Sequence, residues 1–447
     1  MQRSQCSFSL ITLGCAKNEV DSARMKQALL SAGYSFTPEP SCADAILINT
    51  CSFLQSATEE SIEVIFDALG LERVGKASPQ VVVCGCMPAR YGADLAESLH
   101  EVTCYIPCAD EVHVVDRLDA LLGITPAGEG KAAAKAPQSE SEAFCAPLFD
   151  IGTTSAYIKI SDGCDRFCAF CAIPFIRGRY HSFSYEAIEA DVREALTAGA
   201  RELILIAQDT GRWGCDLPGG HDLAWLVRTL AEAHPDTWIR VMYLEPEGIT
   251  DELLSCMATH GNVCSYLDIP LQHVSASVLE RMNRTGSARE FLALLSHIRS
   301  LVPDITLRTT IVCGFPGETE EDMDELCDFL EEARFDYVGV FDFSPEEGTV
   351  AYELPDQIDP EERLERAQRV RDLSDALSAG IIAERIGREM AVLVEGREED
   401  GQLVGRAQSQ APEVDGETYV DEGEIGEVIR VRIVDTMLYE MEGERLR

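Results

Sequence analysis

Cys164, Cys168 and Cys171 have the spacing C-x3-C-x2-C within the run KISDGCDRFCAFCAIPFIRG. Thiolate is the soft ligand that iron–sulfur clusters need, and three thiolates so close in sequence can hold three irons of a four-iron, four-sulfur cluster. The fourth iron is then open to a small molecule, as a catalytic metal must be. The triplet therefore predicts a cluster that takes part in chemistry. A zinc site or a set of buried thiols is the alternative, but no further Cys or His follows before His181.

A second set of cysteines stands at the ends of predicted strands. The β-rich runs SFSLITLG, DAILINTC and VVVCGC alternate with the amphipathic segments DSARMKQALLSAG and TEESIEVIFDAL. This order predicts a parallel sheet, in which ligands gather at the carboxyl ends of the strands. Cys15, Cys51 and Cys86 each stand at such an end. They would meet along one edge of the sheet and could hold a second cluster with an open iron.

The remaining cysteines of this segment have weaker positional arguments. The chain has 17 cysteines in 447 residues, and a chain of this size favours ligands and buried thiols over disulfides. Cys84 is interpreted as a core residue. The pattern assigns no ligand role to the others, which are Cys6, Cys42, Cys104 and Cys108.

Pattern and composition divide the chain into three domains and a linker. Residues 6–122 form the N-terminal α/β domain, and residues 123–150, rich in Ala, Gly, Pro and Ser, form the linker. Strand–helix units repeat about six times over residues 151–387, which predicts a partial (β/α)6 barrel with its site at the carboxyl ends of the strands. Residues 388–447 contain short strands separated by Gly turns, which predict a small β-barrel. The expected fold class is therefore α/β with a C-terminal barrel.

The cysteine motifs resemble those of a known family. C-x3-C-x2-C with an aromatic residue, here Phe170, before the last Cys is the signature of radical S-adenosylmethionine (SAM) enzymes. GCDRFCAFCAIPFIRG resembles the version of this signature in the MiaB/RimO family of methylthiotransferases. LGCAKN, NTC and GC, which contain Cys15, Cys51 and Cys86, resemble the ligand motifs of an auxiliary cluster in that family. The last domain resembles the TRAM domain, an OB-like module, so the resemblance extends over essentially the whole chain.

The resemblance implies two 4Fe-4S clusters and SAM as cofactors. SAM would chelate the open iron of the cluster held by Cys164, Cys168 and Cys171, and an electron from a low-potential donor would cleave it to methionine and a 5′-deoxyadenosyl radical. A methyl group from another SAM would join a sulfur held at the auxiliary cluster. The radical would remove hydrogen from an unactivated carbon, which then takes the methylthio group. The resemblance assigns no catalytic residue beyond the cluster ligands.

Polar residues near the ends of the core strands could contact SAM. Gln208 ends one predicted strand and could bond the ribose or the amino group, and Arg308 lies on another strand and could pair with the methionine carboxylate. A core carboxylate is the alternative partner for Arg308. His273 is a weaker candidate, because a lone His is more often a structural group.

Charge points to the kind of partner. The chain has 37 Lys and Arg against 78 Asp and Glu, for a net charge of −41, and such a surface repels nucleic acid. The last domain alone has seven Arg and no Lys against 16 acidic residues, which argues against RNA binding. A basic protein is the better-matched partner, and the alternative is that the acidity only maintains solubility.

This argument separates two branches of the family. MiaB-type enzymes modify a tRNA adenosine, whereas RimO-type enzymes modify an aspartate of the basic ribosomal protein S-twelve. LGCAKNEVDS, AIPFIRG and QAPEVDGETYV also look RimO-like. We therefore predict the β-carbon of an aspartate of protein S-twelve as the site of methylthio transfer, with the tRNA adenosine as the alternative. An iron–sulfur electron carrier or a metal-stabilised binding scaffold is an alternative of a different class, but neither explains two separate sets of three cysteines.

No membrane partner is expected. No apolar run is long enough to cross a bilayer, and the first residues lack the features of a signal peptide. We therefore expect a cytoplasmic protein.

Overall fold

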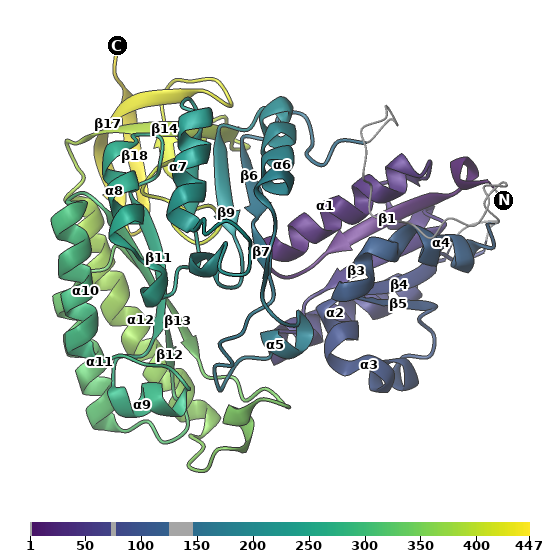
Figure 1. Cartoon of the computed structure of the whole chain (residues 1–447), viewed down its shortest axis with the longest axis horizontal. Helices are drawn as coiled ribbons and strands as arrows, with labels where there is room; N and C mark the ends of the chain where they lie inside the picture. The colour runs from purple at the N-terminus through teal and green to yellow at the C-terminus, as the bar shows by residue number, and fades with distance from the viewer. Residues whose placement is uncertain (1, 73–76, 125–145) are drawn as a thin grey trace. The chain divides into compact units, whose positions relative to one another are not determined.

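The computed structural model describes residues 2–72, 77–124 and 146–447 (Figure 1). Most of the expected linker lies outside the described residues. The chain divides into two compact units, of which the first comprises Met1–Asp150 and Ala172–Gly178 and the second comprises Ile151–Cys171 and Arg179–Arg447. The short segment after the cysteine triplet therefore groups with the first unit.

The first unit contains a five-stranded parallel sheet, as the alternating pattern predicted. Its strands have the order β2-β1-β3-β4-β5 and are β1 (Ser7–Thr12), β2 (Ser35–Phe36), β3 (Ala45–Thr50), β4 (Gln80–Gly85) and β5 (Cys104–Pro107). Its helices are α1 (Ala16–Ser31), α2 (Gln55–Leu69), α3 (Cys86–Ser98), α4 (Val114–Leu122) and the short α5 (Ile173–Ile176).

Helices cover both faces of this sheet. Met25 of α1 and Leu118 of α4 belong to one apolar cluster, and Ile65 of α2 and Leu95 of α3 belong to the other. The central strand β3 is buried along its whole length, which accounts for its continuous apolar run. The arrangement leaves the carboxyl ends of the strands as the natural place for a site.

The second unit begins with six parallel strands, also as predicted. The strands are β6 (Ser155–Lys159), β9 (Glu202–Ile206), β10 (Trp238–Val241), β11 (Tyr266–Gln272), β12 (Thr306–Cys313) and β13 (Tyr337–Asp342). They form two sheets of three strands, with orders β10-β9-β6 and β11-β12-β13, and a parallel bridge between Ile239 and Val263 links the two. Within the described residues β6 and β13 do not pair, so the six-stranded array is open.

Helices and short connections surround this array (Figure 1). The larger helices are α6 (Tyr185–Ala198), α7 (Leu223–Ala233), α8 (Asp251–Thr259), α10 (Ala288–Leu301), α11 (Glu320–Ala333) and α12 (Pro360–Ala383). The shorter elements are β7 (Ser161–Asp162), β8 (His181–Ser182) and α9 (Ala276–Arg281). None of the helices in the described part of the chain combines the length and the apolar character that crossing a bilayer requires.

A closed barrel of five strands ends the chain. The strands are β14 (Glu389–Arg397), β15 (Leu403–Ala407), β16 (Thr418–Val420), β17 (Val428–Met437) and β18 (Glu440–Arg445). Pairing of β14 with β17 closes the barrel. The first six residues of β17 alternate between exposed and buried positions, as the sequence VIRVRI predicts for a strand with one face in a core.

A buried charge network joins this barrel to the six-stranded array. Glu202 is fully buried at the start of β9 and accepts hydrogen bonds from Arg240 Nε at 2.7 Å and Arg406 Nη2 at 2.5 Å. Burial acts to raise the pKa of Glu202, but the two guanidinium groups hold this pKa below its ordinary value. Glu202 lies at the amino end of β9, away from the carboxyl ends where the site is expected, which indicates a structural role for the network.

We expect Glu202→Ala to destabilise the second unit by about 3–5 kcal/mol, because it leaves buried guanidinium groups without their carboxylate. The measurement is the midpoint of urea-induced unfolding. The control is Glu384→Ala, which removes an ion pair to Arg334 whose side chains are more than half exposed. A surface pair contributes at most about 1 kcal/mol, so equal effects of the two substitutions would contradict the expectation.

Candidate functional site

The structure brings Cys15, Cys51 and Cys86 together at one edge of the first sheet. Strands β1, β3 and β4 are neighbours, and the three cysteines follow their carboxyl ends. Thr50 of β3 pairs with Gly85 of β4, so Cys51 and Cys86 are the next residues on adjacent strands. The strand-end geometry predicted from the alternating pattern is therefore present.

Two glycines beside these cysteines are required by the backbone and by crowding. Gly14 has a φ of +95°, and a Cβ there would lie 2.7 Å from the Cβ of Cys51. Gly85 has a φ of +90°, and a Cβ there would lie 2.2 Å from Oδ1 of Asn49. L-residues avoid this region of φ and a Cβ would not fit, which explains the Gly before each of Cys15 and Cys86.

Two asparagines fix the loops that carry the cysteines. Asn18 Nδ2 donates to the carbonyl oxygens of Leu13 at 2.9 Å and Thr50 at 3.0 Å. Asn49 Nδ2 donates to the carbonyl oxygen of Asn18 at 2.9 Å and to Oγ of Ser22 at 2.9 Å. These buried bonds tie the end of β1 to the end of β3, so the Asn residues of LGCAKN and NTC position the loops that carry the cysteines.

The thiols of this edge lie in contrasting surroundings. Burial raises the pKa of Cys51 to about 11. A hydrogen bond with Cys108 and the nearby Arg177 guanidinium hold the pKa of Cys86 below its usual range. Arg177 Nη2 lies 3.7 Å from Sγ of Cys86, and its Nη1 pairs with Asp21 at 2.5 Å. Thiolate is the form that binds iron, so these contacts favour ligation by Cys86.

The three strand-end cysteines have the sulfur donors that a four-iron cluster needs. Among the described residues, no group of three or more His, Cys, Asp or Glu side chains has the spacing of a site for a single metal ion. In a four-iron cluster each thiolate binds a different iron, so the sulfurs need not converge on one point. Three soft donors at one sheet edge fit such a cluster.

The second cysteine set lies in a loop of the second unit, after β7. Cys164 is buried and Cys168 and Cys171 are partly buried, and the backbone N–H of Cys171 donates to the carbonyl oxygen of Cys168 at 3.0 Å. The side-chain amide of Asn283 donates to the carbonyl oxygen of Phe167 at 2.9 Å. Phe167 has a φ of +51°, which turns the loop between the first two cysteines. The three cysteines thus share a short, fixed loop, as predicted.

A charged pocket adjoins Cys168. Arg284 Nη1 lies 3.7 Å from Sγ of Cys168 and donates to Oε1 of Glu245 at 3.0 Å, and Nη2 donates to the other carboxylate oxygen of Glu245. Arg166 and Asn283 line the same hollow of about 190 Å³. The volume is below the 300–1,000 Å³ of a typical small-molecule site and therefore suits one part of a cofactor.

Sequence reasoning missed this pair. Glu245 follows β10 in the run WIRVMYLEP, so the strand-end argument could have identified it. Arg284 carries no local signal, because only the fold brings it to Cys168.

Buried polar atoms without partners follow β9. Gln208 Nε2 donates to Oδ1 of Asp162 at 2.9 Å, whereas its Oε1 is buried and has no partner among the described residues. The same holds for Oδ1 of Asp209 and Oγ1 of Thr210. Buried polar groups are nearly always bonded, so these atoms fit a polar ligand such as SAM.

The structure gives Arg308 protein partners. Arg308 is the third residue of β12, and its Nη1 donates to Oδ1 of Asp268 at 2.9 Å. Its Nε lies 3.6 Å from Oδ1 of Asp415, which belongs to the barrel domain. These contacts favour the core-carboxylate alternative, and the SAM contact of Arg308 stays a prediction without support from this geometry.

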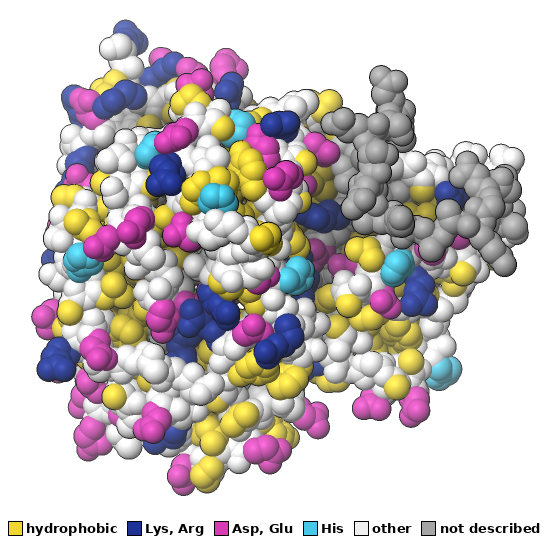
Figure 2. Space-filling view, viewed as in Figure 1, with side chains coloured by type: hydrophobic (Ala, Val, Ile, Leu, Met, Phe, Trp, Pro, Cys, Tyr) yellow, Lys and Arg dark blue, Asp and Glu magenta, His cyan; other side chains and the backbone are white. Residues whose placement is uncertain are grey.

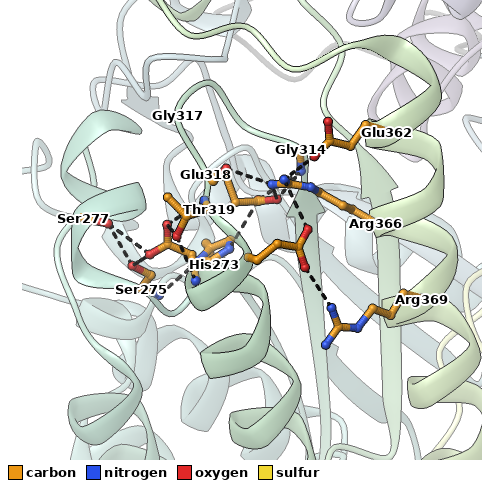
Figure 3. Close-up of polar contacts among 12 residues, drawn as sticks. His273, Ser275, Ser277, Gly314, Gly317, Glu318, Thr319, Glu362, Arg366 and Arg369 are labelled. Carbon is orange, nitrogen blue, oxygen red and sulfur yellow. Dashed lines mark hydrogen bonds and ion pairs between the residues drawn. The ribbon is translucent and has the colours of Figure 1, made fainter.

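His273 belongs to a buried network around Glu318 (Figure 3). His273 Nε2 lies 3.4 Å from Oε2 of Glu318, and both side chains are fully buried. The Glu318 carboxylate accepts from the Gly314 N–H at 3.0 Å and from Arg366 Nη1 at 2.9 Å. The GFPGE run is therefore tied to α12, which agrees with a structural role for His273.

We expect Arg284→Ala to lower SAM cleavage about 10- to 100-fold, the usual effect of losing a residue that supports a metal ligand. The substitution removes the cation beside Cys168 and leaves Glu245 buried without its partner. The measurement is 5′-deoxyadenosine formed under a chemical reductant. The exposed Arg289 provides the control, since Arg289→Ala should retain activity, and equal activity of the two variants would contradict a role for Arg284.

Comparisons with known proteins match three parts of the chain to family models. Residues 7–107 match the uncharacterized protein family UPF0004, residues 158–330 match the radical SAM superfamily and residues 386–446 match the TRAM domain. A protein of Geobacter sulfurreducens named "Ribosomal protein uS12 methylthiotransferase RimO" is 37% identical over 99% of both chains. A protein of Trichlorobacter lovleyi with the same name is 38% identical over 98% of both chains.

Solved structures share the fold at low identity. The radical SAM methyltransferase TsrM from Kitasatospora setae matches with a TM-score of 0.55 and 14% identity, over 78% of this chain and 74% of that chain. The cobalamin-dependent SAM radical enzyme OxsB matches with a TM-score of 0.51 and 14% identity, over 83% of this chain and 56% of that chain. The fold is thus that of radical SAM enzymes, and the relatives found by sequence are named as methylthiotransferases. The chain belongs to the RimO family of radical SAM methylthiotransferases.

Proposed function

We propose that the chain transfers a methylthio group to the β-carbon of an aspartate in ribosomal protein S-twelve, with SAM and two 4Fe-4S clusters as cofactors. The observation that carries this proposal is the pair of three-cysteine sets, one in each unit and each associated with the end of a strand. Three ligands to each cluster would leave one iron open in both.

The proposed clusters and SAM supply the radical and the sulfur, and the residues of the chain hold them. Cys164, Cys168 and Cys171 would hold the cluster that binds SAM, and Cys15, Cys51 and Cys86 the auxiliary cluster. The corresponding domains are residues 6–122, the linker 123–150, the core 151–387 and the TRAM domain 388–447.

The residues near Cys168 have distinct roles in this proposal. The Glu245 carboxylate holds the Arg284 guanidinium against the Cys168 sulfur and neutralises the charge of that guanidinium. Gln208, whose Oε1 has no partner in the described part of the chain, would accept a hydrogen bond from the amino group or ribose of SAM. The β-carbon hydrogen of an aspartate is not acidic enough for a side-chain base, which is why the reaction needs a radical.

Charge and relatives support the choice of substrate. Figure 2 shows Asp and Glu side chains spread over the face in view, in keeping with the net charge of −41. Such a surface attracts a basic protein and repels the phosphates of tRNA. The relatives named above carry the name of the same ribosomal protein. We place the reaction in the cytoplasm, with a low-potential protein as electron donor.

The test offers both substrates of the wider family to the reconstituted protein. Protein S-twelve and tRNA are incubated in parallel with SAM and a reductant, and each is analysed by mass spectrometry. A methylthio group on an aspartate of S-twelve and none on tRNA is the expected result. A methylthio-adenosine in the tRNA would support methylthio transfer as the reaction but contradict S-twelve as the substrate.

A further inference from the structure

A fourth cysteine lies in the same row as two of the strand-end cysteines. Pro107, the last residue of β5, pairs with Gly85 of β4. Cys108 therefore directly follows β5 where Cys86 directly follows the neighbouring β4, just as Cys51 directly follows β3 on the other side. The sequence assigned no position to Cys108, because β5 is short and only the sheet order brings its end to this edge.

The side chains of Cys86 and Cys108 are in contact. Cys108 packs against the apolar cluster formed by Cys86, Ala172 and Ile176, and its thiol acts to lower the pKa of Cys86. Cys86 is 5% exposed, so this contact lies away from bulk water.

Arg177 approaches the same sulfur. Its Nη2 lies 3.7 Å from Sγ of Cys86 and donates to Oδ1 of Asn18 at 2.6 Å. Its Nη1 pairs with the Asp21 carboxylate, which keeps the guanidinium in place. The Cys86 sulfur thus faces two donors, the thiol of Cys108 and the guanidinium of Arg177.

Hydrogen bonds to a ligand sulfur change the properties of a cluster. They draw electron density from the sulfur, which stabilises the reduced and more negative cluster and raises its reduction potential. A thiol is a weak donor, but in a buried site a weak bond has little competition from water. A neutral thiol beside a bound thiolate can act in this way without binding iron.

We propose that Cys108 is a positioning residue whose thiol donates a hydrogen bond to the sulfur of Cys86 and, with Arg177, raises the reduction potential of the auxiliary cluster. The inference rests on the auxiliary cluster of the proposed function. It leaves the fourth iron free for the sulfur that is to be transferred, because Cys108 does not occupy it.

The test isolates the auxiliary cluster in the full-length chain. Cys164, Cys168 and Cys171 are replaced by Ala, the protein is reconstituted with iron and sulfide, and the cluster is titrated electrochemically with electron paramagnetic resonance as the readout. In this background Cys108→Ala should keep its iron content. The ratio of reduced to oxidised cluster at a fixed potential should fall about three- to tenfold, where tenfold corresponds to about 59 mV for one electron.

Two further variants separate the hydrogen bond from packing. Cys108→Ser keeps an O–H donor, so the ratio of reduced to oxidised cluster should fall less in this variant than in Cys108→Ala. Cys104→Ala removes a partly buried thiol from β5, the strand that precedes Cys108. Cys104 packs against the apolar cluster that contains Met25 and Leu118, so its loss should leave the reduction potential of the cluster unchanged.

Each remaining outcome counts against the inference in a distinct way. An unchanged potential in Cys108→Ala, with full iron content, would overturn the hydrogen bond as a tuning contact. Loss of iron in that variant would show Cys108 to be a ligand and overturn the positioning role. If the background protein itself holds no cluster, the proposed function fails, and this inference fails with it.

Discussion

Cys164→Ala is expected to reduce SAM cleavage to the level of a protein-free control. Cys164 is the most buried of the three cysteines in its loop and one of only three protein ligands predicted for the cluster. With one ligand lost, the cluster has too few attachments to hold SAM at an open iron and reduce it. The measurement is 5′-deoxyadenosine and methionine released under anaerobic conditions with a chemical reductant.

A matched thiol elsewhere in the second unit provides the control. Cys327→Ala removes a partly buried cysteine of α11 and should leave cleavage unchanged. Normal cleavage by Cys164→Ala would show that the C-x3-C-x2-C loop does not hold the reactive cluster.

Cys15→Ala is expected to separate the two halves of the reaction. The variant should still cleave SAM, because the cluster loop of the second unit is untouched, but methylthio transfer should stop. Cys15 precedes α1 and is the exposed member of the strand-end set, so its loss should disturb the fold little. Iron content should fall by about half if one of two four-iron clusters is lost.

The control for this experiment is Cys42→Ala. Cys42 is another exposed cysteine of the first unit, in the 3₁₀ helix Pro40–Cys42, and its variant should retain both activities and its full iron content. Methylthio transfer by Cys15→Ala at the normal rate would mean that the sulfur comes from elsewhere. Loss of SAM cleavage together with transfer would mean that the two cysteine sets do not act independently.

The fold could be predicted from the sequence because its strands have strong patterns. The first four residues of β3, AILI, form an apolar run, and alternation of such runs with helices implies a parallel sheet. That reasoning also places Cys51 and Cys86, because each directly follows such a strand. The position of Cys108 could not be found in this way, because β5 has only four residues and lacks such a pattern.

Contacts between distant side chains were the least predictable part of the site. Arg308 and Arg284 are both cations of the second unit, but only Arg284 lies beside a cluster cysteine. Arg308 occupies the early part of β12, where Asp268 of the neighbouring strand is its direct partner in register. The Arg308 pair depends on strand register, and the Arg284 pair depends on how two loops meet in the fold; the hydrophobic pattern alone specifies neither.

Deuterium labelling tests the proposed radical removal of hydrogen from an aspartate β-carbon. Protein S-twelve is prepared with deuterium on the β-carbons of its aspartates and is incubated with the reconstituted protein, SAM and a reductant. The proposed mechanism predicts deuterium in 5′-deoxyadenosine and a methylthio group on one aspartate of S-twelve. A methylthio group on S-twelve with unlabelled 5′-deoxyadenosine, or no modified S-twelve despite SAM cleavage, would contradict it.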